Sequence, residues 1–276
     1  LRYGTIPLEG LVRKAKAMGI EKLVLTDINN TTGIPDFVKL AKEEGIKPVG
    51  GVDVRNGDSS LYILIARNNH GFFEINQFLS TYHLRKTEYP SEAPQFGEVF
   101  VIYPLEHYPQ RKLADHERIG VRPHQLLSLF SHAASRQASH LVILHSVSFQ
   151  NAQYYDLHRH LRAIHHNVLL SRLQESFLGH PGALFVAPEE LEKQFENHQQ
   201  LVVNTERLLA LCEIDFDFST IKNKATYTGD KEDDRILLEK LSRDGFRYRY
   251  PHADGKTLKR LDHELKIIHE LGFSAY

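Results

Sequence analysis

Two aspartates follow apolar runs at positions where metal-dependent chemistry could assemble. Asp27 closes the run LVLTD, and Asp53 closes the run GGVD. Such runs are typical of buried strands, and in α/β sheets and barrels the carboxyl ends of strands are where sites form. Two carboxylates brought together there could hold a divalent cation. The alternative, which we favour, is that each aspartate caps the turn that follows it.

Histidine is the second potential metal ligand, with 17 copies against a single cysteine, Cys212. The lone cysteine excludes internal disulfides and a cysteine-based zinc cage. In HRHLRAIHHN, helical geometry puts His158, Arg162 and His165 on one side, but the HExxH pattern of zinc proteases is absent. We therefore expect a partly exposed helix with polar side chains. His145, which ends the run LVILH, is better placed for a ligand, although a hydrogen-bonded structural histidine is the favoured alternative.

Motifs for nucleotide binding and for serine hydrolysis are missing from the sequence. No glycine belongs to a GxGxxG or GxxxxGK[ST] phosphate loop, and no GxSxG elbow occurs. The net charge of −1 removes the strongest signature of an autonomous nucleic-acid binder, because Lys and Arg neutralise phosphates in such proteins. Arg85 and Lys86, in the stretch YHLRK, are the DNA-contact candidates, with a solvated surface as the favoured alternative. No apolar run reaches the roughly 20 residues of a membrane span, so we expect a cytoplasmic protein without a membrane partner.

Alternating helices and short apolar strands must position these residues. Periodicity predicts helices over 5–19, 34–45 and 71–82, and strands over 22–27, 48–54, 61–66, 99–104 and 140–147. Steps of this length favour a parallel sheet in a layered or barrel α/β fold. The polar, proline-containing stretch 105–125 stays without an assigned element.

After these strands the pattern becomes helical over 150–173, 188–196 and 204–214. A polar segment at 217–233 predicts a linker, and two charged amphipathic helices follow it. We therefore expect one domain over 1–216 and a second region over 217–276. Residue 1 is not methionine, and the last residues, 273–276, are largely apolar with no helix stop signal. We therefore also expect this chain to be a piece of a longer protein.

Taken in order, these segments resemble the PHP (polymerase and histidinol phosphatase) domain at the N-terminus of bacterial DNA polymerase III alpha subunits. The resemblance is carried by the stretch from RYGTIPLEGL to KPVGGVDV, by LYILIARNNHGFFEINQFLS, by the pairing of APEELEKQF with NTERLLALCEIDF, and by LDHELKIIHELGFSAY. It implies a distorted (β/α) PHP-type barrel over 1–216, with its first strand preceding Leu1. Residues 217–276 would then be a linker and helices that lead toward the polymerase palm.

Positions that hold metal ligands in this family carry different side chains here. The resemblance aligns Ile28 and Leu61 with ligand histidines, and Asp53 with a glutamate. Ser146 and Ser148 stand where the family has an Asp-x-His pair. An aliphatic side chain cannot bind a cation, and a neutral hydroxyl is a weak ligand beside histidine or carboxylate. We therefore predict a vestigial site at these positions and at the aspartate of the first predicted strand, with no bound metal and no catalytic residue.

The resemblance implies two alternative functions. In the first, the chain is a structural, partner-docking domain of a replicative polymerase and is inactive by itself. Its partners would be the rest of the alpha subunit and, for the full-length protein, a proofreading exonuclease, the sliding clamp and primed DNA, with Mg²⁺ bound by polymerase carboxylates beyond Tyr276. In the second, the chain is an active metal-dependent phosphoesterase, pyrophosphatase or 3'-5' exonuclease. That function would need a His pair before Leu1 and substitute ligands such as His145.

Overall fold

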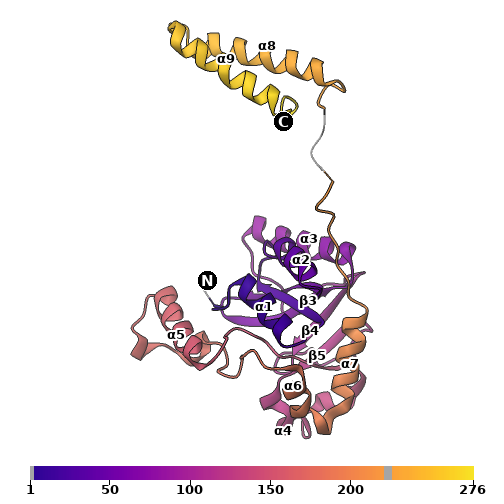
Figure 1. Cartoon of the computed structure of the whole chain (residues 1–276). Helices are drawn as coiled ribbons and strands as arrows, with labels where there is room; N and C mark the ends of the chain where they lie inside the picture. The colour runs from indigo at the N-terminus through magenta and orange to yellow at the C-terminus, as the bar shows by residue number, and fades with distance from the viewer. Residues whose placement is uncertain (1–2, 221–225) are drawn as a thin grey trace. The chain divides into compact units, whose positions relative to one another are not determined.

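The short apolar runs pair into one six-stranded sheet, which curls within the first part of the chain (Figure 1). The computed structural model describes residues 3–220 and 226–276, so residues 221–225 of the predicted linker lie outside the described residues. The strands cross the sheet in chain order: β1 (Lys22–Ile28), β2 (Lys47–Asn56), β3 (Ser59–Ala66), β4 (Val99–Pro104), β5 (Glu117–Val121) and β6 (Leu141–Ile143). This curled α/β sheet is the distorted-barrel type of fold that the PHP resemblance implies, and that expectation is confirmed.

The strand directions differ from the parallel sheet that the element spacing favours. β1 and β2 pair in parallel, as do β4, β5 and β6, but β3 runs antiparallel to both of its neighbours. Only Gly57 and Asp58 separate β2 from β3, and Gly57 supplies the positive φ of 59° that the tight turn needs. The parallel prediction is wrong here because a two-residue connection can join only antiparallel strands.

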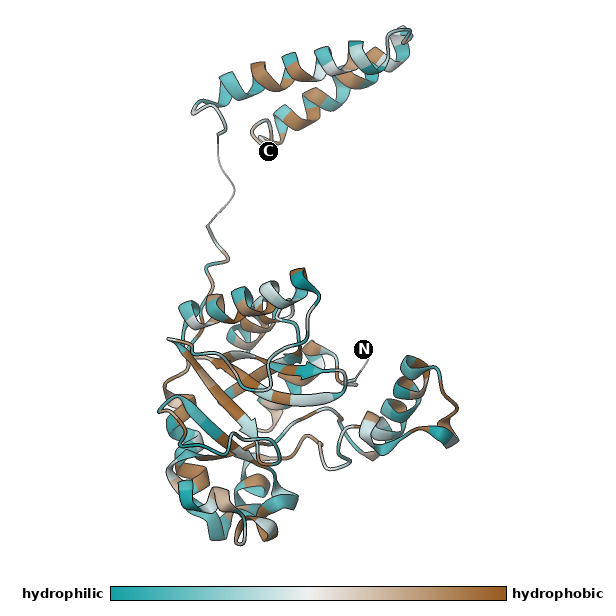
Figure 2. Ribbon diagram, turned by 180° about the vertical axis from the view of Figure 1, so that it is seen from behind, coloured by the Kyte–Doolittle hydropathy of each residue, from teal (hydrophilic) through white to brown (hydrophobic). Residues whose placement is uncertain are grey.

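Apolar layers cover both faces of the sheet. On one face, α1 (Leu8–Ala17), α2 (Ile34–Glu43) and α3 (Asn69–Arg85) bury side chains such as Phe37 against a layer that includes Leu64. On the other face, α7 (Gln199–Ala210) packs Leu208 with Ile63 and Phe100. The neighbours Ile63 and Leu64 belong to opposite layers, because side chains alternate along a strand. Figure 2 shows the hydrophobic strands in brown, beside helices striped in brown and teal.

Several elements differ in extent from their sequence-based bounds. β5 lies inside the unassigned stretch 105–125, and the strand predicted over 140–147 ends at Ile143. The helix predicted over 150–173 is α5 (Ala152–His166), which ends where Asn167 adopts a left-handed φ of 52°. Two short helices, α4 (Leu126–Leu129) and α6 (Pro188–Gln194), complete this part of the chain.

The chain divides into two compact units, Leu1–Phe216 and Asp217–Tyr276. The second unit is a pair of helices, α8 (Lys231–Arg249) and α9 (Gly255–Glu270), joined by an ion pair between Arg243 Nη2 and Asp262 Oδ1 at 3.0 Å. The side chains of Asp230 and Asp254 cap the two helices by accepting backbone N–H bonds. Across the described residues, no helix combines the length and the apolar character that crossing a membrane requires.

An ion pair between the buried Glu117 and the exposed Arg111 holds the start of β5. Glu117 accepts hydrogen bonds from Arg111 (Nη1 and Nη2, both 2.7 Å) and from the N–H of Ala114 (2.7 Å). Burial alone would raise the pKa of Glu117, but these donors outweigh it and lower the pKa to about 2. Because the folded-state pKa lies below the ordinary value of 4.5, this stabilisation is present above pH 4.5 and is lost as the pH falls toward 2.

We expect Glu117→Gln to lower the free energy of unfolding by about 2 kcal/mol at pH 7. Near pH 2 the variant and the native chain should differ little in this free energy, because protonation of Glu117 then removes most of the stabilisation. Urea denaturation followed by circular dichroism at both pH values measures this. Glu92→Gln is the matched control, because Glu92 contacts the same guanidinium (Arg111 Nε to Oε2, 3.0 Å) with a side chain that is 53% exposed. Equal losses in the two variants at neutral pH would contradict the assignment.

Candidate functional site

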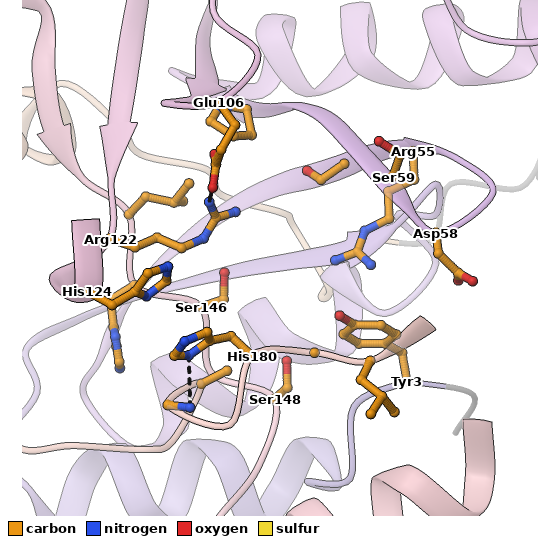
Figure 3. A pocket seen from close by; sticks show the side chains of 18 of the residues that line it. Tyr3, Arg55, Asp58, Ser59, Glu106, Arg122, His124, Ser146, Ser148 and His180 are labelled. Carbon is orange, nitrogen blue, oxygen red and sulfur yellow. Dashed lines mark hydrogen bonds and ion pairs between the residues drawn. The ribbon is translucent and has the colours of Figure 1, made fainter. Parts of the chain in front are cut away.

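The carboxyl ends of β2, β4, β5 and β6 converge on one edge of the sheet, where they border a cavity of about 360 Å³. We call this cavity the carboxyl-end pocket. The loops after these strands and the segment 178–183 form its walls (Figure 3). Its polar side chains are Tyr3, Arg55, Asp58, Ser59, Ser60, Glu106, His107, Arg122, His124, His145, Ser146, Ser148 and His180. The pocket lies at the strand ends that the sequence singled out, but most of its residues are different ones.

Asp53, on β2, is bonded to two of the residues that line the pocket. Its Oδ2 accepts hydrogen bonds from Arg55 Nε (2.8 Å) and Nη2 (2.6 Å), and its Oδ1 accepts one from Ser60 Oγ (2.7 Å). Burial disfavours the charged guanidinium, but Asp53 outweighs that effect and raises the pKa of Arg55. Both oxygens of the carboxylate therefore already have partners within the chain.

The two acidic side chains that line the pocket are paired in the same way. Glu106 accepts two bonds from Arg122 Nη1, at 3.0 Å to Oε1 and 3.1 Å to Oε2. Asp58 pairs with Arg162 of α5, and its Oδ2 lies 2.9 Å from Nε2 of His166. Each carboxylate at or beside the pocket thus has a guanidinium partner from this chain.

Asp27 does not join Asp53 in one site. The parallel register of β1 and β2 places Asp27 opposite Val52 and Ile28 opposite Asp53. Paired residues share a face of the sheet, so Asp27 lies on the α1–α3 face with Val52, and Asp53 lies on the other face. Asp27 Oδ2 lies close to Gly33, the residue before α2: a Cβ added at Gly33 would lie 3.0 Å from this oxygen. The two-carboxylate metal site weighed from the sequence is therefore not assembled.

The remaining vestigial positions fit a metal cluster poorly. Ile28 is the neighbour of Asp53 in the register, and Leu61 packs against the apolar layer on the α1–α3 face. Within residues 3–220 and 226–276, no group of three or more His, Cys, Asp or Glu side chains is arranged to hold a metal ion. Four histidines, His107, His124, His145 and His180, line the pocket beside the hydroxyls and the paired carboxylates, but within the described residues none of them belongs to such a group. The expectation that no metal binds stays a prediction.

The segment that follows β6 supplies His145, Ser146 and Ser148 to the pocket wall. Figure 3 shows the two serines. The backbone oxygen of Ser148 accepts bonds from the N–H (2.9 Å) and Oγ1 (3.1 Å) of Thr5, which ties this segment to the start of the chain. His145 donates through Nε2 to the backbone oxygen of Leu184 at 2.9 Å, and burial lowers its pKa. This hydrogen bond to the backbone agrees with the structural alternative for His145.

Sequence reasoning missed the two arginines, Arg55 and Arg122, and three further histidines, His107, His124 and His180, that line the pocket. The rings of His124 and His180 stack at 4.0 Å between centroids, with an interplanar angle of 10°. Burial lowers the pKa of His124, and His180 and Arg122 lower it further. Arg122 and His124 fall in the stretch 105–125 that had no assigned element. Arg55 follows Asp53 by two residues. The same strand-end argument could therefore have found it, if the argument had been applied to positively charged side chains as well as to metal-binding ones.

Arg85 and Lys86 lie apart from these pocket residues, at the C-terminal end of α3. Both are exposed, and Lys86 adopts a left-handed φ of 53° as the helix ends. We predict that the chain binds labelled single-stranded and primed DNA with a dissociation constant above about 1 µM at physiological salt. Fluorescence anisotropy tests this. Submicromolar binding that is lost in the Arg85→Gln/Lys86→Gln variant and kept in Asp27→Asn would contradict the prediction and identify a DNA contact.

Comparison with known proteins agrees with this architecture. The PHP domain family matches residues 1–214. The DNA polymerase III subunit alpha of Neisseria meningitidis serogroup B is 23% identical over 327 residues, which cover 99% of this chain and 28% of the relative. The corresponding subunit of Halalkalibacterium halodurans is 24% identical over 311 residues, which cover 98% of this chain and 27% of the relative.

A third relative, an error-prone DNA polymerase of Symbiobacterium thermophilum, is 23% identical over 325 residues, which cover 99% of this chain and 30% of the relative. The chain thus spans between 27% and 30% of the length of these three proteins. The family match extends over most of the sequence and includes every strand of the curled sheet. The chain therefore belongs to the PHP domain family and is homologous to the N-terminal region of DNA polymerase III alpha subunits.

Proposed function

We propose that this chain is the PHP domain of a bacterial replicative polymerase in which metal-dependent hydrolysis is lost and the pocket is structural. One observation carries the proposal: Asp53, Asp58 and Glu106 each form an ion pair with an arginine of the same chain. A guanidinium occupies the carboxylate lone pairs that a divalent cation needs, and its charge repels the cation.

The burial of these pairs supports the same conclusion. The side chains of Arg55 and Asp53 are 12% and 14% exposed. A metal that took Asp53 would leave the Arg55 guanidinium without its partner in this enclosed position, at a cost on the order of 3 kcal/mol. Ile28, Leu61, Ser146 and Ser148 offer no strong ligand to offset that cost.

In this proposal the domain acts in DNA replication as a scaffold, and it docks against the remainder of the polymerase chain. The helices of the 217–276 unit would lead toward the palm. The full-length protein would contact a proofreading exonuclease, the sliding clamp and primed DNA in the cytoplasm, and Mg²⁺ would belong to its polymerase site. The names of the relatives support this assignment, because they are DNA polymerase III alpha subunits and an error-prone DNA polymerase.

Hydrolysis assays of the purified chain test the proposal. We expect no p-nitrophenolate from bis(p-nitrophenyl) phosphate, no phosphate from pyrophosphate and no labelled nucleotide from 3'-labelled DNA above the protein-free rate, with Mn²⁺, Zn²⁺ or Mg²⁺ present. Asp53→Asn is the diagnostic variant, and Asp36→Asn, at an exposed position on α2, is the matched control for contaminating phosphatases. Activity that is lost in Asp53→Asn and kept in Asp36→Asn would establish the hydrolase alternative and overturn the proposal.

A further inference from the structure

A second cavity, of about 210 Å³, lies at the opposite end of β5 from the carboxyl-end pocket. We call it the amino-end pocket. Its polar lining consists of Arg118, Ser139, Gln200, Asn204 and Arg207, with two leucines beside them. None of the lining residues is acidic. Two arginines and no carboxylate give this pocket a positive charge.

Arg118 is a half-buried cation whose side-chain hydrogen bonds go to backbone oxygens. Its Nη1 donates to the backbone oxygens of Asp115 (2.6 Å) and Glu117 (2.8 Å), and its guanidinium lies 5.4 Å from the centroid of the Phe100 ring. Carbonyl oxygens and an aromatic face stabilise the cation without neutralising it. In the part of the chain that the structure describes, Arg118 forms no ion pair. Burial lowers the pKa of Arg118, and the charge of Asp115 offsets this only in part.

Arg207 brings a second positive charge to the same cavity from α7. Its side chain is exposed, and among residues 3–220 and 226–276 it has no hydrogen-bond or ion-pair partner. Gln200 and Asn204 precede it on the same helix and are bonded to each other, Nε2 to Oδ1, at 2.7 Å. This arrangement contrasts with the carboxyl-end pocket, where Arg55 and Arg122 are each paired with a carboxylate.

We propose that the amino-end pocket binds a phosphate-class oxyanion through Arg118 and Arg207. A phosphate group accepts several charge-assisted N–H bonds, and the planar guanidinium matches its geometry in a bidentate manner. Such a ligand would neutralise two cations that form no ion pair within the described residues, one of them half-buried. A free phosphate and a phosphate of a nucleic-acid strand offer this chemistry alike. The site is independent of the function proposed above, because it shares no residue with the carboxyl-end pocket.

Calorimetric titration of the 276-residue chain tests this inference. The probes are inorganic phosphate and a short oligothymidylate, each in a low-salt buffer without competing oxyanions. We expect saturable binding of one phosphate, weakened at least tenfold by Arg207→Gln, a variant at an exposed position that leaves the core intact. Arg118→Gln should weaken it by at least as much. Arg118→Lys should bind phosphate more tightly than Arg118→Gln, because lysine keeps the positive charge but lacks the planar guanidinium that binds in a bidentate manner.

The control is Arg13→Gln, which makes the same charge change at an exposed position on α1. Tighter, Arg207-dependent binding of the oligothymidylate than of phosphate would support the site with a nucleic-acid strand as its ligand. Binding of inorganic phosphate but not of the oligothymidylate would support the site with a free anion as its ligand. Two outcomes overturn the inference: the absence of saturable binding of either probe, or an equal loss of affinity in Arg13→Gln, Arg118→Gln and Arg207→Gln.

Discussion

Replacement of Gly51 by alanine should destabilise the first unit by about 3 kcal/mol. Gly51 lies on β2, between Thr26 of β1 and Ile65 of β3. A Cβ at this position would lie 2.3 Å from the backbone oxygen of Leu64 and 2.9 Å from Cδ1 of Ile65. Because the oxygen belongs to a paired strand, the sheet itself must shift to relieve the overlap. Urea denaturation followed by circular dichroism measures the change in the free energy of unfolding.

Gly10→Ala is the matched control in the same unit. The atom nearest to its Cβ position is Cδ of Pro7 at 3.8 Å, an ordinary contact. Alanine is the better helix former by up to about 1 kcal/mol, so this variant should be as stable as the native chain or more stable. If Gly51→Ala and Gly10→Ala had equal stability, the close approach of β2 and β3 at Gly51 would be wrong.

Arg162→Ala should cost about 3 kcal/mol and loosen one wall of the carboxyl-end pocket. The Arg162 side chain is 3% exposed, pairs with Asp58, and donates through Nε to the backbone oxygen of Phe177 at 2.8 Å. It therefore joins α5 both to the β2–β3 turn and to the segment that leads into 178–183. Removal of the guanidinium leaves a partly buried carboxylate undercompensated, which is the costly way to break an ion pair.

Arg159→Ala on the same helix is the control for this prediction. Its side chain is 40% exposed and lies 3.5 Å from Asp156, so we expect a change below about 0.5 kcal/mol. Limited proteolysis should cut the Arg162→Ala variant within 167–183 faster than the native chain. Equal denaturation midpoints and equal cleavage rates for the two variants would show that Arg162 does not anchor this wall.

Apolar periodicity was sufficient to predict the helices and strands that bury mainly apolar side chains. The helices at the start of the chain and the strands β1 to β4 fall in this class. β5 was missed because Glu117 and Arg118 open it. Glu117 is buried through a pair with Arg111, and such a pair exists only in the folded chain. A strand that begins with a buried charge cannot be recognised from alternation of apolar residues.

The helix α5 reverses the usual relation between polarity and exposure. Its histidines and arginine led to the prediction of a partly exposed polar helix, which is wrong for His158 and Arg162. His158 is fully buried, donates through Nδ1 to the oxygen of Tyr3 at 2.7 Å, and accepts from the N–H of Gly179 at 2.9 Å. These two side chains are buried because they find partners from distant segments: backbone groups of Tyr3, Phe177 and Gly179, and the carboxylate of Asp58.

The position of the candidate site was predictable, but its composition was not. Strand ends pointed to the correct edge of the sheet, since β2, β4, β5 and β6 all end at the carboxyl-end pocket. A shift of one residue in the pairing of β1 with β2 would change whether Asp27 and Asp53 lie on the same face of the sheet. The apolar pattern of the two strands did not allow us to predict this register. Two of the arginine partners likewise become visible only in the folded chain: Arg122 meets Glu106 where the loops after β4 and β5 come together, and Arg162 of α5 meets Asp58 of the β2–β3 turn.

Metal content of the purified 276-residue chain is the most direct test of the central claim, that paired carboxylates close this pocket to divalent cations. The chain would be incubated with Mn²⁺ or Zn²⁺, freed of unbound metal by gel filtration, and analysed by mass spectrometry of the elements. We expect metal well below one equivalent, with no difference between the native chain and Asp53→Asn. Two or three retained equivalents, lost in Asp53→Asn and kept in Asp36→Asn, would contradict it.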